Sequence, residues 1–218
     1  MSDPEGRVLL ALSGSNTQQW HDLLSRERNV TLTADGPGDP SIAYAIVWKQ
    51  PPRLLASLPN LKAIFSMGAG VDHLMASPDL PDVPIVRVVA NNLSQHMKEY
   101  VVWRVLDHHR QGLHYRTQQP KRIWHEPPQP TTNNVSVGIM GLGELGRACA
   151  QALLGLGFRV NGWSRRAQAI EGIATWHGAD GLTPFLNATD ILVVLLPYTP
   201  ATHGIVDYSV LARLRRDN

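Results

Sequence analysis

The stretch GLGELG contains three glycines spaced in a way that suits phosphate binding. An apolar run that reads as a strand precedes it, and an amphipathic segment that reads as a helix follows. In that setting Gly141 allows a tight turn, Gly143 lets a phosphate approach the backbone, and Gly146 lets helix and strand pack closely. The free amides and the dipole at the helix start favour an anion. The residues expected to hold the diphosphate of a dinucleotide are therefore Gly141, Gly143, Glu144, Leu145 and Gly146; the alternative is a glycine turn without a ligand.

A basic turn follows the next predicted strand, at Ser164, Arg165 and Arg166. It lies roughly 20 residues after the glycines, where NAD-binding proteins place an Asp or Glu that bonds the ribose hydroxyls. A carboxylate there would repel a 2′-phosphate, whereas a hydroxyl and two guanidiniums can hold one through charge-assisted hydrogen bonds. We therefore predict NADP(H) in preference to NAD(H). The alternative is a solvated basic turn.

Composition narrows the class of protein. A chain of 218 residues with 43% hydrophobic residues can form one large domain or two small ones. Its net charge of +2, without a long basic block, argues against a nucleic-acid partner. The single cysteine, Cys149, excludes a disulfide framework and a cysteine metal site, and we expect it to be a buried packing residue with no metal nearby. No apolar run has the length of a membrane span and the N-terminus lacks a signal-peptide layout, so we expect a cytoplasmic protein without a membrane partner.

Strands and helices alternate along the chain, which predicts an α/β fold with parallel sheets and two domains. A long helix and a proline-rich connector separate the two series of elements. The expected strands are 7–12, 42–48, 61–67, 84–89, 135–141, 158–164 and 190–197. The expected helices are 16–27, 94–112, 144–157 with Gly157 as its cap, 167–171, 183–187, and a last helix capped by Asp207. The expected boundaries are 1–93, 94–134 and 135–218.

Seven stretches together resemble one protein family over residues 7–216. The chain is similar to the D-isomer-specific 2-hydroxyacid dehydrogenases, and within them to the glyoxylate/hydroxypyruvate reductase A branch. The stretches are VWKQPP (47–52), MGAGVDHL (67–74), MKEYVVWRVLDHHR (97–110), YRTQQPKRIW (115–124), VGIMGLGELG (137–146), GWSRR (162–166) and LPYTPATHGIVD (196–207).

The resemblance implies a flavodoxin-like substrate domain in 1–93 and a Rossmann nucleotide-binding domain in 135–218. Between them, 94–134 would cross between the domains and form the contact of a homodimer. The reaction implied is NADPH-dependent reduction of a small 2-keto acid, glyoxylate or hydroxypyruvate. The implied substrate residues are Trp48 beside the substrate and the amides of Ala69, Gly70 and Val71 on its carboxylate. The implied residues beside the nicotinamide are Leu196, Pro197 and Thr202.

The catalytic residues of the family have no counterpart in this sequence. The resemblance places its polarising Arg, its Glu and its proton-donating His beyond Asn218, so we expect both domains to be incomplete at their C-terminal side and the chain alone to be inactive. His73 and His96 are not in the family's catalytic context, and we do not assign them that role. Two other functions stay open. One is a non-catalytic nucleotide-binding interaction protein on the same fold; the other is a dehydrogenase of the phosphoglycerate or formate type.

Overall fold

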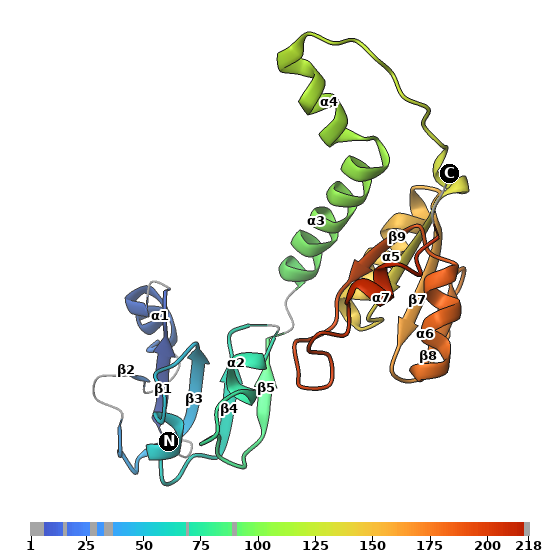
Figure 1. Ribbon diagram of the computed structural model, residues 1–218. Coiled ribbons are helices and arrows are strands. Elements are labelled where there is room, and N and C mark those ends of the chain that lie inside the picture. The colour runs from blue at the N-terminus through green and yellow to red at the C-terminus, as the bar shows by residue number, and fades with distance from the viewer. Residues whose placement is uncertain are drawn as a thin grey trace. The chain divides into compact units, whose positions relative to one another are not determined.

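The computed structural model describes residues 7–14, 17–26, 30–32, 37–68, 70–88 and 91–215 of the chain. The contacts divide it into two compact units, residues 1–89 with 197–200, and residues 90–196 with 201–218. Each unit contains one parallel sheet covered by helices (Figure 1). The predicted α/β class with parallel sheets is therefore confirmed.

The first unit contains a five-stranded sheet in the order β2-β1-β3-β4-β5. This is the strand order of flavodoxin-like doubly wound sheets, as the resemblance implied. Its strands are β1 (Arg7–Leu12), β2 (Val30–Leu32), β3 (Ile42–Trp48), β4 (Ala63–Ser66) and β5 (Ile85–Arg87). Its helices are α1 (Thr17–Leu24), the 3-10 helix η2 (Leu55–Ser57) and α2 (Asp72–Met75).

Strand β1 shows why this sheet is buried on both faces. Leu9 and Ala11 belong to a buried cluster that includes residues of η2 and α2. Leu10 points to the opposite face, into a cluster completed by Leu24 of α1. Parallel sheets bury both faces in this way, so their strands are nearly continuous apolar runs, and such runs are the signal that predicted β1 and β3.

The second unit contains a four-stranded sheet in the order β8-β7-β6-β9, all parallel. Numbered along the sheet this is 3-2-1-4, the order found in a Rossmann domain. Its strands are β6 (Ser136–Met140), β7 (Arg159–Ser164), β8 (Ala174–His177) and β9 (Ile191–Val194). Its helices are α3 (Asn91–His109), α4 (Gly112–Gln118), η3 (Gln119–Lys121), η4 (Thr132–Asn134), α5 (Glu144–Gly155), α6 (Gly178–Asn187) and α7 (Tyr208–Leu211).

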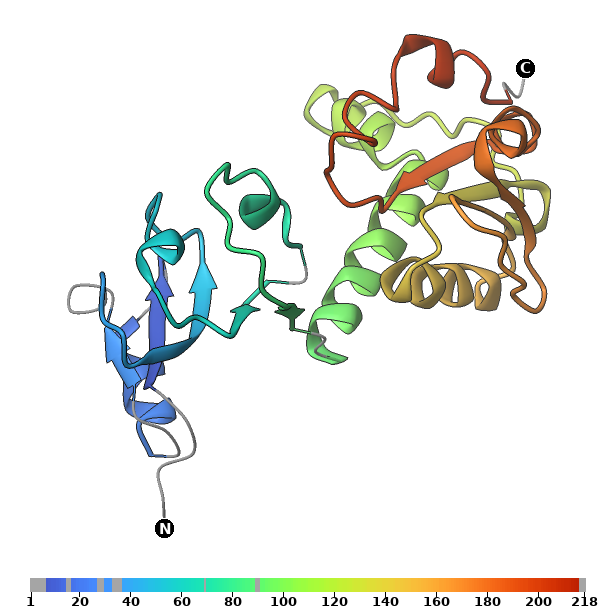
Figure 2. The same ribbon diagram turned by 90° about the horizontal axis from the view of Figure 1, so that it is seen from below.

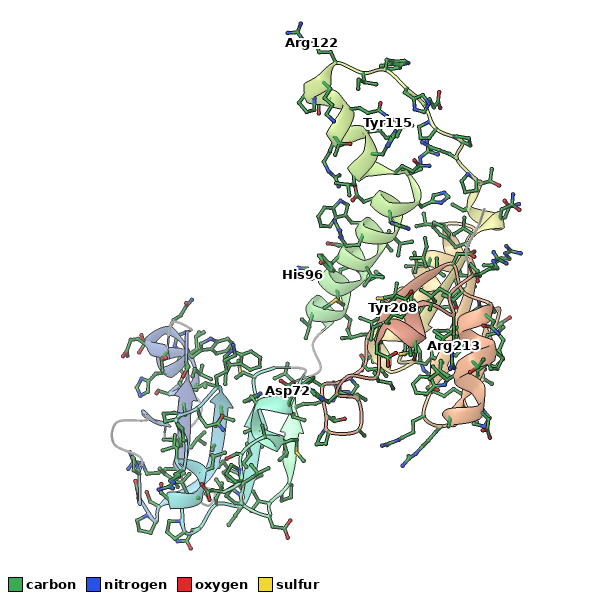
Figure 3. The ribbon with its side chains drawn as sticks, viewed as in Figure 1. Asp72, His96, Tyr115, Arg122, Tyr208 and Arg213 are labelled. Atoms are coloured by element: carbon green, nitrogen blue, oxygen red, sulfur yellow. The ribbon has the colours of Figure 1, made fainter. Side chains whose placement is uncertain are left out.

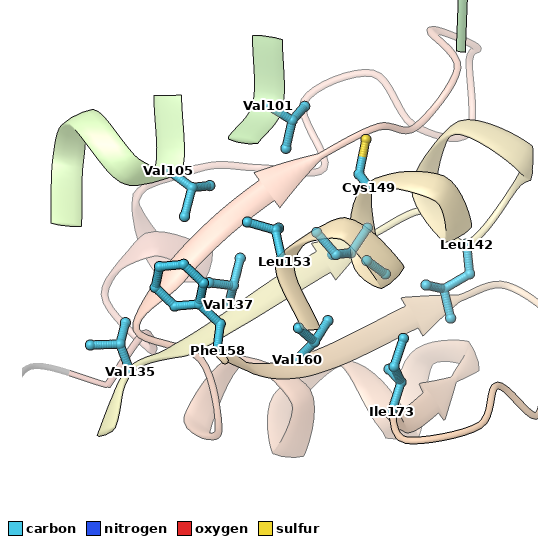
Figure 4. Packing of buried hydrophobic residues seen from close by; sticks show 12 residues of the cluster. Val101, Val105, Val135, Val137, Leu142, Cys149, Leu153, Phe158, Val160 and Ile173 are labelled. Carbon is cyan, nitrogen blue, oxygen red and sulfur yellow. The ribbon is translucent and has the colours of Figure 1, made fainter. Parts of the chain in front are cut away.

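Helices cover both faces of this second sheet. On one face α3 lies along α5, and Val101 and Val105 pack with Leu153 and Phe158 (Figures 2 and 4). On the other face Phe185 of α6 is fully buried with residues of β6 and β7. Cys149 is fully buried in the first of these clusters, as predicted, and burial raises the pKa of its thiol.

Some predicted elements are wrong or shifted. The helix expected at 167–171 does not form; Ile170 instead pairs with Ile173 in an isolated bridge that leads into β8, a strand that was not predicted. A segment of that length is too short to be stable as a helix without an apolar face to bury. The short strand β2 was also not predicted. Helix α3 begins and ends three residues earlier than expected. It ends early because the chain turns at Gln111, which has a left-handed φ of 55°.

The helix expected at 183–187 is also longer than predicted. It begins at Gly178 and contains Pro184 within its length, so α6 spans ten residues. The expected caps are present elsewhere: Gly157 has a φ of +88°, and the Asp207 carboxylate accepts a 2.9 Å hydrogen bond from the amide of Val210. Within the described ranges, no helix combines the length and apolarity that crossing a membrane requires.

Candidate functional site

The glycine turn lies between the carboxyl ends of two neighbouring strands. The amide of Gly141, directly after β6, donates a 2.8 Å hydrogen bond to the carbonyl oxygen of Trp163 in β7. The amide of Leu195, directly after β9, donates a 2.8 Å hydrogen bond to the carbonyl oxygen of Met140. The ends of β7, β6 and β9 therefore converge around the turn, at the edge where open α/β sheets bind ligands.

Two of the three glycines are required by close backbone packing. Gly141 has a φ of +109°, and a Cβ on it would lie 2.8 Å from the carbonyl oxygen of Leu195. A Cβ on Gly146 would lie 1.9 Å from the carbonyl oxygen of Gly141, because the first turn of α5 packs directly on the glycine turn. A side chain at either position would displace backbone atoms.

Gly143 differs because the space beside it is open. It is the N-cap residue of α5, is exposed, and a Cβ there would meet no atom within 4 Å. No side chain caps the helix. The first amides of a helix have no partner inside the helix, so those of Glu144, Leu145 and Gly146 are available to an external acceptor. The open space and these amides together form a cradle that suits a phosphate.

The basic turn is part of a segment that begins at the last residue of β7 and continues as an irregular loop, residues 164–168, which we call the basic loop. The Ser164 side chain is buried, and its hydroxyl donates a 2.7 Å hydrogen bond to the carbonyl oxygen of Arg166. Arg165 and Arg166 are exposed. Within the described part of the chain, neither guanidinium has an ion pair or a side-chain hydrogen bond. The Ser164 hydroxyl thus fixes the backbone, and the two guanidiniums are the groups left to meet an anion.

Two polar residues, one beside this loop and one at its end, were not singled out from the sequence. Arg147, on the first turn of α5, donates from Nε to the carbonyl oxygen of Leu142 at 3.2 Å and from its terminal nitrogen to Oε1 of Gln168. Arg147 directly follows the last glycine of the motif, which is a signal for its position. Gln168 lies in the stretch expected to be a helix, so the sequence contained no signal for this contact.

The loop after β9 begins beside the glycine turn. A Cβ on Gly141 would lie 3.2 Å from Cδ2 of Leu196, and the Leu196 side chain is half-buried in the cluster around Phe185. Pro197 is exposed and Thr202 is half-buried. Pro197 is grouped with the first unit and Thr202 with the second. Leu196 therefore packs beside the glycine turn.

The predicted substrate residues lie at the ends of β3 and β4 in the first unit. Ser66 is fully buried; it accepts a 3.3 Å hydrogen bond from the amide of Gly68, and its hydroxyl lies within bonding distance of the carbonyl oxygens of Gly68 and Gly70. Gly70 and Val71 are half-buried, and Val71 is the N-cap residue of α2. Ala69 lies outside the described residues.

Trp48 lies directly against this loop. A Cβ on Gly68 would be 2.0 Å from Cζ3 of Trp48, so the indole lies against a position that only glycine leaves free. The His73 ring also packs edge-on against the indole, at a centroid distance of 5.0 Å. Burial lowers the pKa of His73, and the nearby Asp72 carboxylate opposes that shift. His73 therefore favours its neutral form. The other histidine considered from the sequence, His96, is exposed on α3 (Figure 3).

Comparison with known proteins identifies the family. Residues 102–218 match the family model described as the NAD binding domain of D-isomer specific 2-hydroxyacid dehydrogenases. The chain belongs to the D-isomer-specific 2-hydroxyacid dehydrogenase family. The resemblance stated from the sequence is therefore confirmed.

Several members of this family are close in sequence or structure. The glyoxylate/hydroxypyruvate reductase A of Yersinia enterocolitica is 36% identical over 210 residues, which cover 93% of this chain and 62% of that protein. A family member from Xanthobacter autotrophicus, solved with NADPH and MES, has a TM-score of 0.90 at 39% identity, covering 97% of this chain and 70% of that one. The NADPH-dependent glyoxylate/hydroxypyruvate reductase of Sinorhizobium meliloti, solved with NADP and sulfate, has a TM-score of 0.88 at 41% identity, covering 96% and 68%. The chain thus spans less than two thirds of the length of the Yersinia relative.

Proposed function

We propose that this protein binds NADP(H) and reduces a small 2-keto acid, glyoxylate or hydroxypyruvate, to the 2-hydroxy acid. The observation that carries the proposal is the pairing of the open cradle at Gly143 with the exposed guanidiniums of Arg165 and Arg166, which have no partner among the described residues. A cradle alone would suit any dinucleotide. The two cations favour one with an additional phosphate, since guanidiniums bind phosphate with paired hydrogen bonds.

The residues present suit the cofactor at each of its charged groups. The backbone of the glycine turn would hold the diphosphate, and the basic loop would hold the 2′-phosphate. Leu196, Pro197 and Thr202 would lie beside the nicotinamide, which supplies the hydride when the cofactor is bound. The residues proposed for the diphosphate are Gly141, Gly143, Glu144, Leu145 and Gly146; those proposed for the 2′-phosphate are Ser164, Arg165 and Arg166. The solved relatives with NADPH and NADP support this choice of cofactor.

The loop after β4 would bind the substrate. Backbone amides of Ala69, Gly70 and Val71 would hold its carboxylate, because concave runs of amides bind anions without a charged side chain. Trp48, which packs against Gly68 and His73, would form an apolar wall that limits substrate size. We assign the proton donor and the polarising cation to no residue of the 218, because the resemblance places both beyond Asn218.

The helix α3 supplies a surface for a second copy. Tyr100 and Trp103 are each 56% exposed on α3, and their rings stack edge-on with centroids 5.9 Å apart. Large exposed aromatic side chains are typical of interfaces. We propose that the segment 94–134 forms the contact of a homodimer, and that the protein acts in the cytoplasm.

A non-catalytic nucleotide-binding protein is the second candidate. It would use the same cradle at Gly143, because a fold that binds a nucleotide need not catalyse a reaction. Turnover separates the two functions. A chain extended through the family's Arg, Glu and His should oxidise NADPH with glyoxylate or hydroxypyruvate, whereas an interaction protein would bind the cofactor without turnover.

Calorimetric titration of the purified chain with NADPH and with NADH tests the cofactor. We expect a dissociation constant for NADPH at least about tenfold lower than for NADH, which corresponds to roughly 1.4 kcal/mol. Equal affinities, or tighter binding of NADH, would overturn the choice of cofactor. Failure to bind either would overturn the nucleotide site itself.

A further inference from the structure

After Ser164, the last residue of β7, the basic loop lacks regular secondary structure, yet side-chain hydrogen bonds hold it at three points. At its start the Ser164 hydroxyl donates to the carbonyl oxygen of Arg166 at 2.7 Å. At its end the Thr175 hydroxyl, from β8, donates to the carbonyl oxygen of Gln168 at 2.6 Å. The third bond runs from the Arg147 guanidinium to Oε1 of Gln168. Gln168 is therefore held by both its backbone and its side chain.

The bond to Arg147 connects the basic loop to the glycine turn. Nε of Arg147 donates to the carbonyl oxygen of Leu142, the residue between the first two glycines, at 3.2 Å. The Leu142 side chain is buried and packs on Gly162 of β7, where a Cβ would lie 2.7 Å from its methyl carbons. A continuous series of contacts thus runs from the turn proposed for the diphosphate to the loop proposed for the 2′-phosphate.

Both acceptors of Arg147 are neutral. In the described ranges of the chain Arg147 has no carboxylate within ion-pair distance, so its charge is not neutralised by the protein. Gln168, two residues after Arg166 in the basic loop, binds this cation without cancelling its charge. An Asp or Glu in place of Gln168 would supply the same hydrogen bond but would also place a negative charge beside the proposed phosphate site.

A fixed loop has an energetic consequence for binding. Arginine side chains lose rotamer freedom when they grip a ligand, and a loop that also had to order its backbone would reduce the affinity further. The bonds at Gln168 remove that second cost before the ligand arrives. They should therefore raise the affinity for a ligand with a 2′-phosphate and leave the affinity for a ligand without one unchanged.

We propose that Gln168 is a positioning residue for NADPH selectivity. Through Arg147 and Thr175 it fixes the basic loop so that Arg165 and Arg166 meet the 2′-phosphate. The inference deepens the proposed function and rests on it. It adds a selectivity determinant outside the Ser-Arg-Arg sequence, on a residue that does not itself touch the phosphate.

The test measures NADPH and NADH dissociation constants for matched variants of the full chain. Gln168→Leu removes the acceptor at similar volume, and we expect it to raise the NADPH constant about fivefold, as loss of one hydrogen bond does, while the NADH constant stays within about twofold. Thr175→Val removes the second bond and should raise the NADPH constant about threefold, whereas Thr175→Ser keeps the hydroxyl and should bind as the wild type does. Titration with 2′,5′-ADP and 5′-AMP should reproduce the same contrast without the nicotinamide.

Each outcome is decisive. Unchanged NADPH affinity in both Gln168→Leu and Thr175→Val would overturn the positioning role. An equal loss of affinity for NADPH and for NADH would also overturn it, because such a loss indicates general damage to the fold. Circular dichroism identifies a variant that fails to fold, and the Val and Ser variants of Thr175 then decide the matter. A wild-type chain that binds NADH but shows no preference for NADPH would overturn both the selectivity in the proposed function and the role of Gln168.

Discussion

The amide of Gly141 donates its hydrogen bond to the carbonyl oxygen of Trp163, the residue directly before the basic loop. This bond joins the first residue of the glycine turn to Trp163 of β7, the residue before Ser164. The two proposed anion sites are therefore fixed relative to each other by main-chain contacts, and their side chains can be altered one at a time.

Removal of either guanidinium in the basic loop should weaken NADPH binding selectively. A hydrogen bond to a charged group contributes about 1.5–3 kcal/mol, so Arg165→Ala or Arg166→Ala should raise the NADPH dissociation constant about 10- to 100-fold. The NADH constant should change little. Arg122→Ala removes the same charge from the end of the α4 segment, far from the strand ends, and serves as the control (Figure 3). A similar loss of affinity in Arg122→Ala would show a nonspecific effect of charge.

Alanine substitutions at Gly146 and Gly143 should distinguish a loss of stability from a loss of cofactor affinity. A Cβ on Gly146 meets the backbone at 1.9 Å, so Gly146→Ala should destabilise the protein by about 1–3 kcal/mol. A Cβ on Gly143 meets nothing within 4 Å, so Gly143→Ala should unfold at the wild-type temperature. Its methyl group would instead occupy the cradle, and we expect NADPH and NADH to bind at least about tenfold more weakly, a cost of roughly 1.4 kcal/mol. Thermal unfolding and calorimetry measure the two effects, and wild-type cofactor binding by Gly143→Ala would contradict the cradle.

The contact between Trp48 and Gly68 should appear as an energetic coupling. In Gly68→Ala the new methyl group would overlap the indole, whose Cζ3 atom lies 2.0 Å from the Cβ position. Overpacking of this kind costs about 1–3 kcal/mol. In the Trp48→Ala background the same substitution should cost far less, because the ring is gone. A double-mutant cycle measured by urea unfolding gives the coupling, and additive effects would show that the ring does not lie against Gly68 in solution.

The sequence predicted the elements whose residues are buried on both sides. Strands β1, β3 and β6 are apolar runs, and the glycine spacing located the turn before α5. It did not predict β8, whose residues are only partly buried and whose pairing with β7 depends on the fold. The contact between Arg147 and Gln168 joins positions 21 residues apart through that unpredicted segment. Local patterns therefore identified the two anion sites but not the polar residues that connect them.

A buried histidine in the second unit should make stability depend on pH. His109 is 7% exposed, and its ring packs edge-on against Phe158 at a centroid distance of 5.1 Å. Burial lowers the pKa of His109, and the charges of Arg110 and His108 lower it further. A cavity beside it is also lined by Asp190, whose carboxylate is paired with the Arg215 guanidinium. The folded protein therefore favours a neutral imidazole at this position.

The sign of the effect follows from which state binds the proton first. Because the folded pKa is lowered, the unfolded chain takes up the proton at higher pH, near its ordinary value of about 6.5. The contribution of His109 is thus fully present above that pH and is lost as the pH falls through it. We expect the midpoint of urea unfolding, followed by circular dichroism, to decrease between about pH 7.5 and 5.5, and to decrease less in His109→Leu, which cannot titrate there. Equal decreases in the two proteins would show that His109 is not buried in its neutral form, because a solvated imidazole would bind the proton equally well in both states and add no pH dependence.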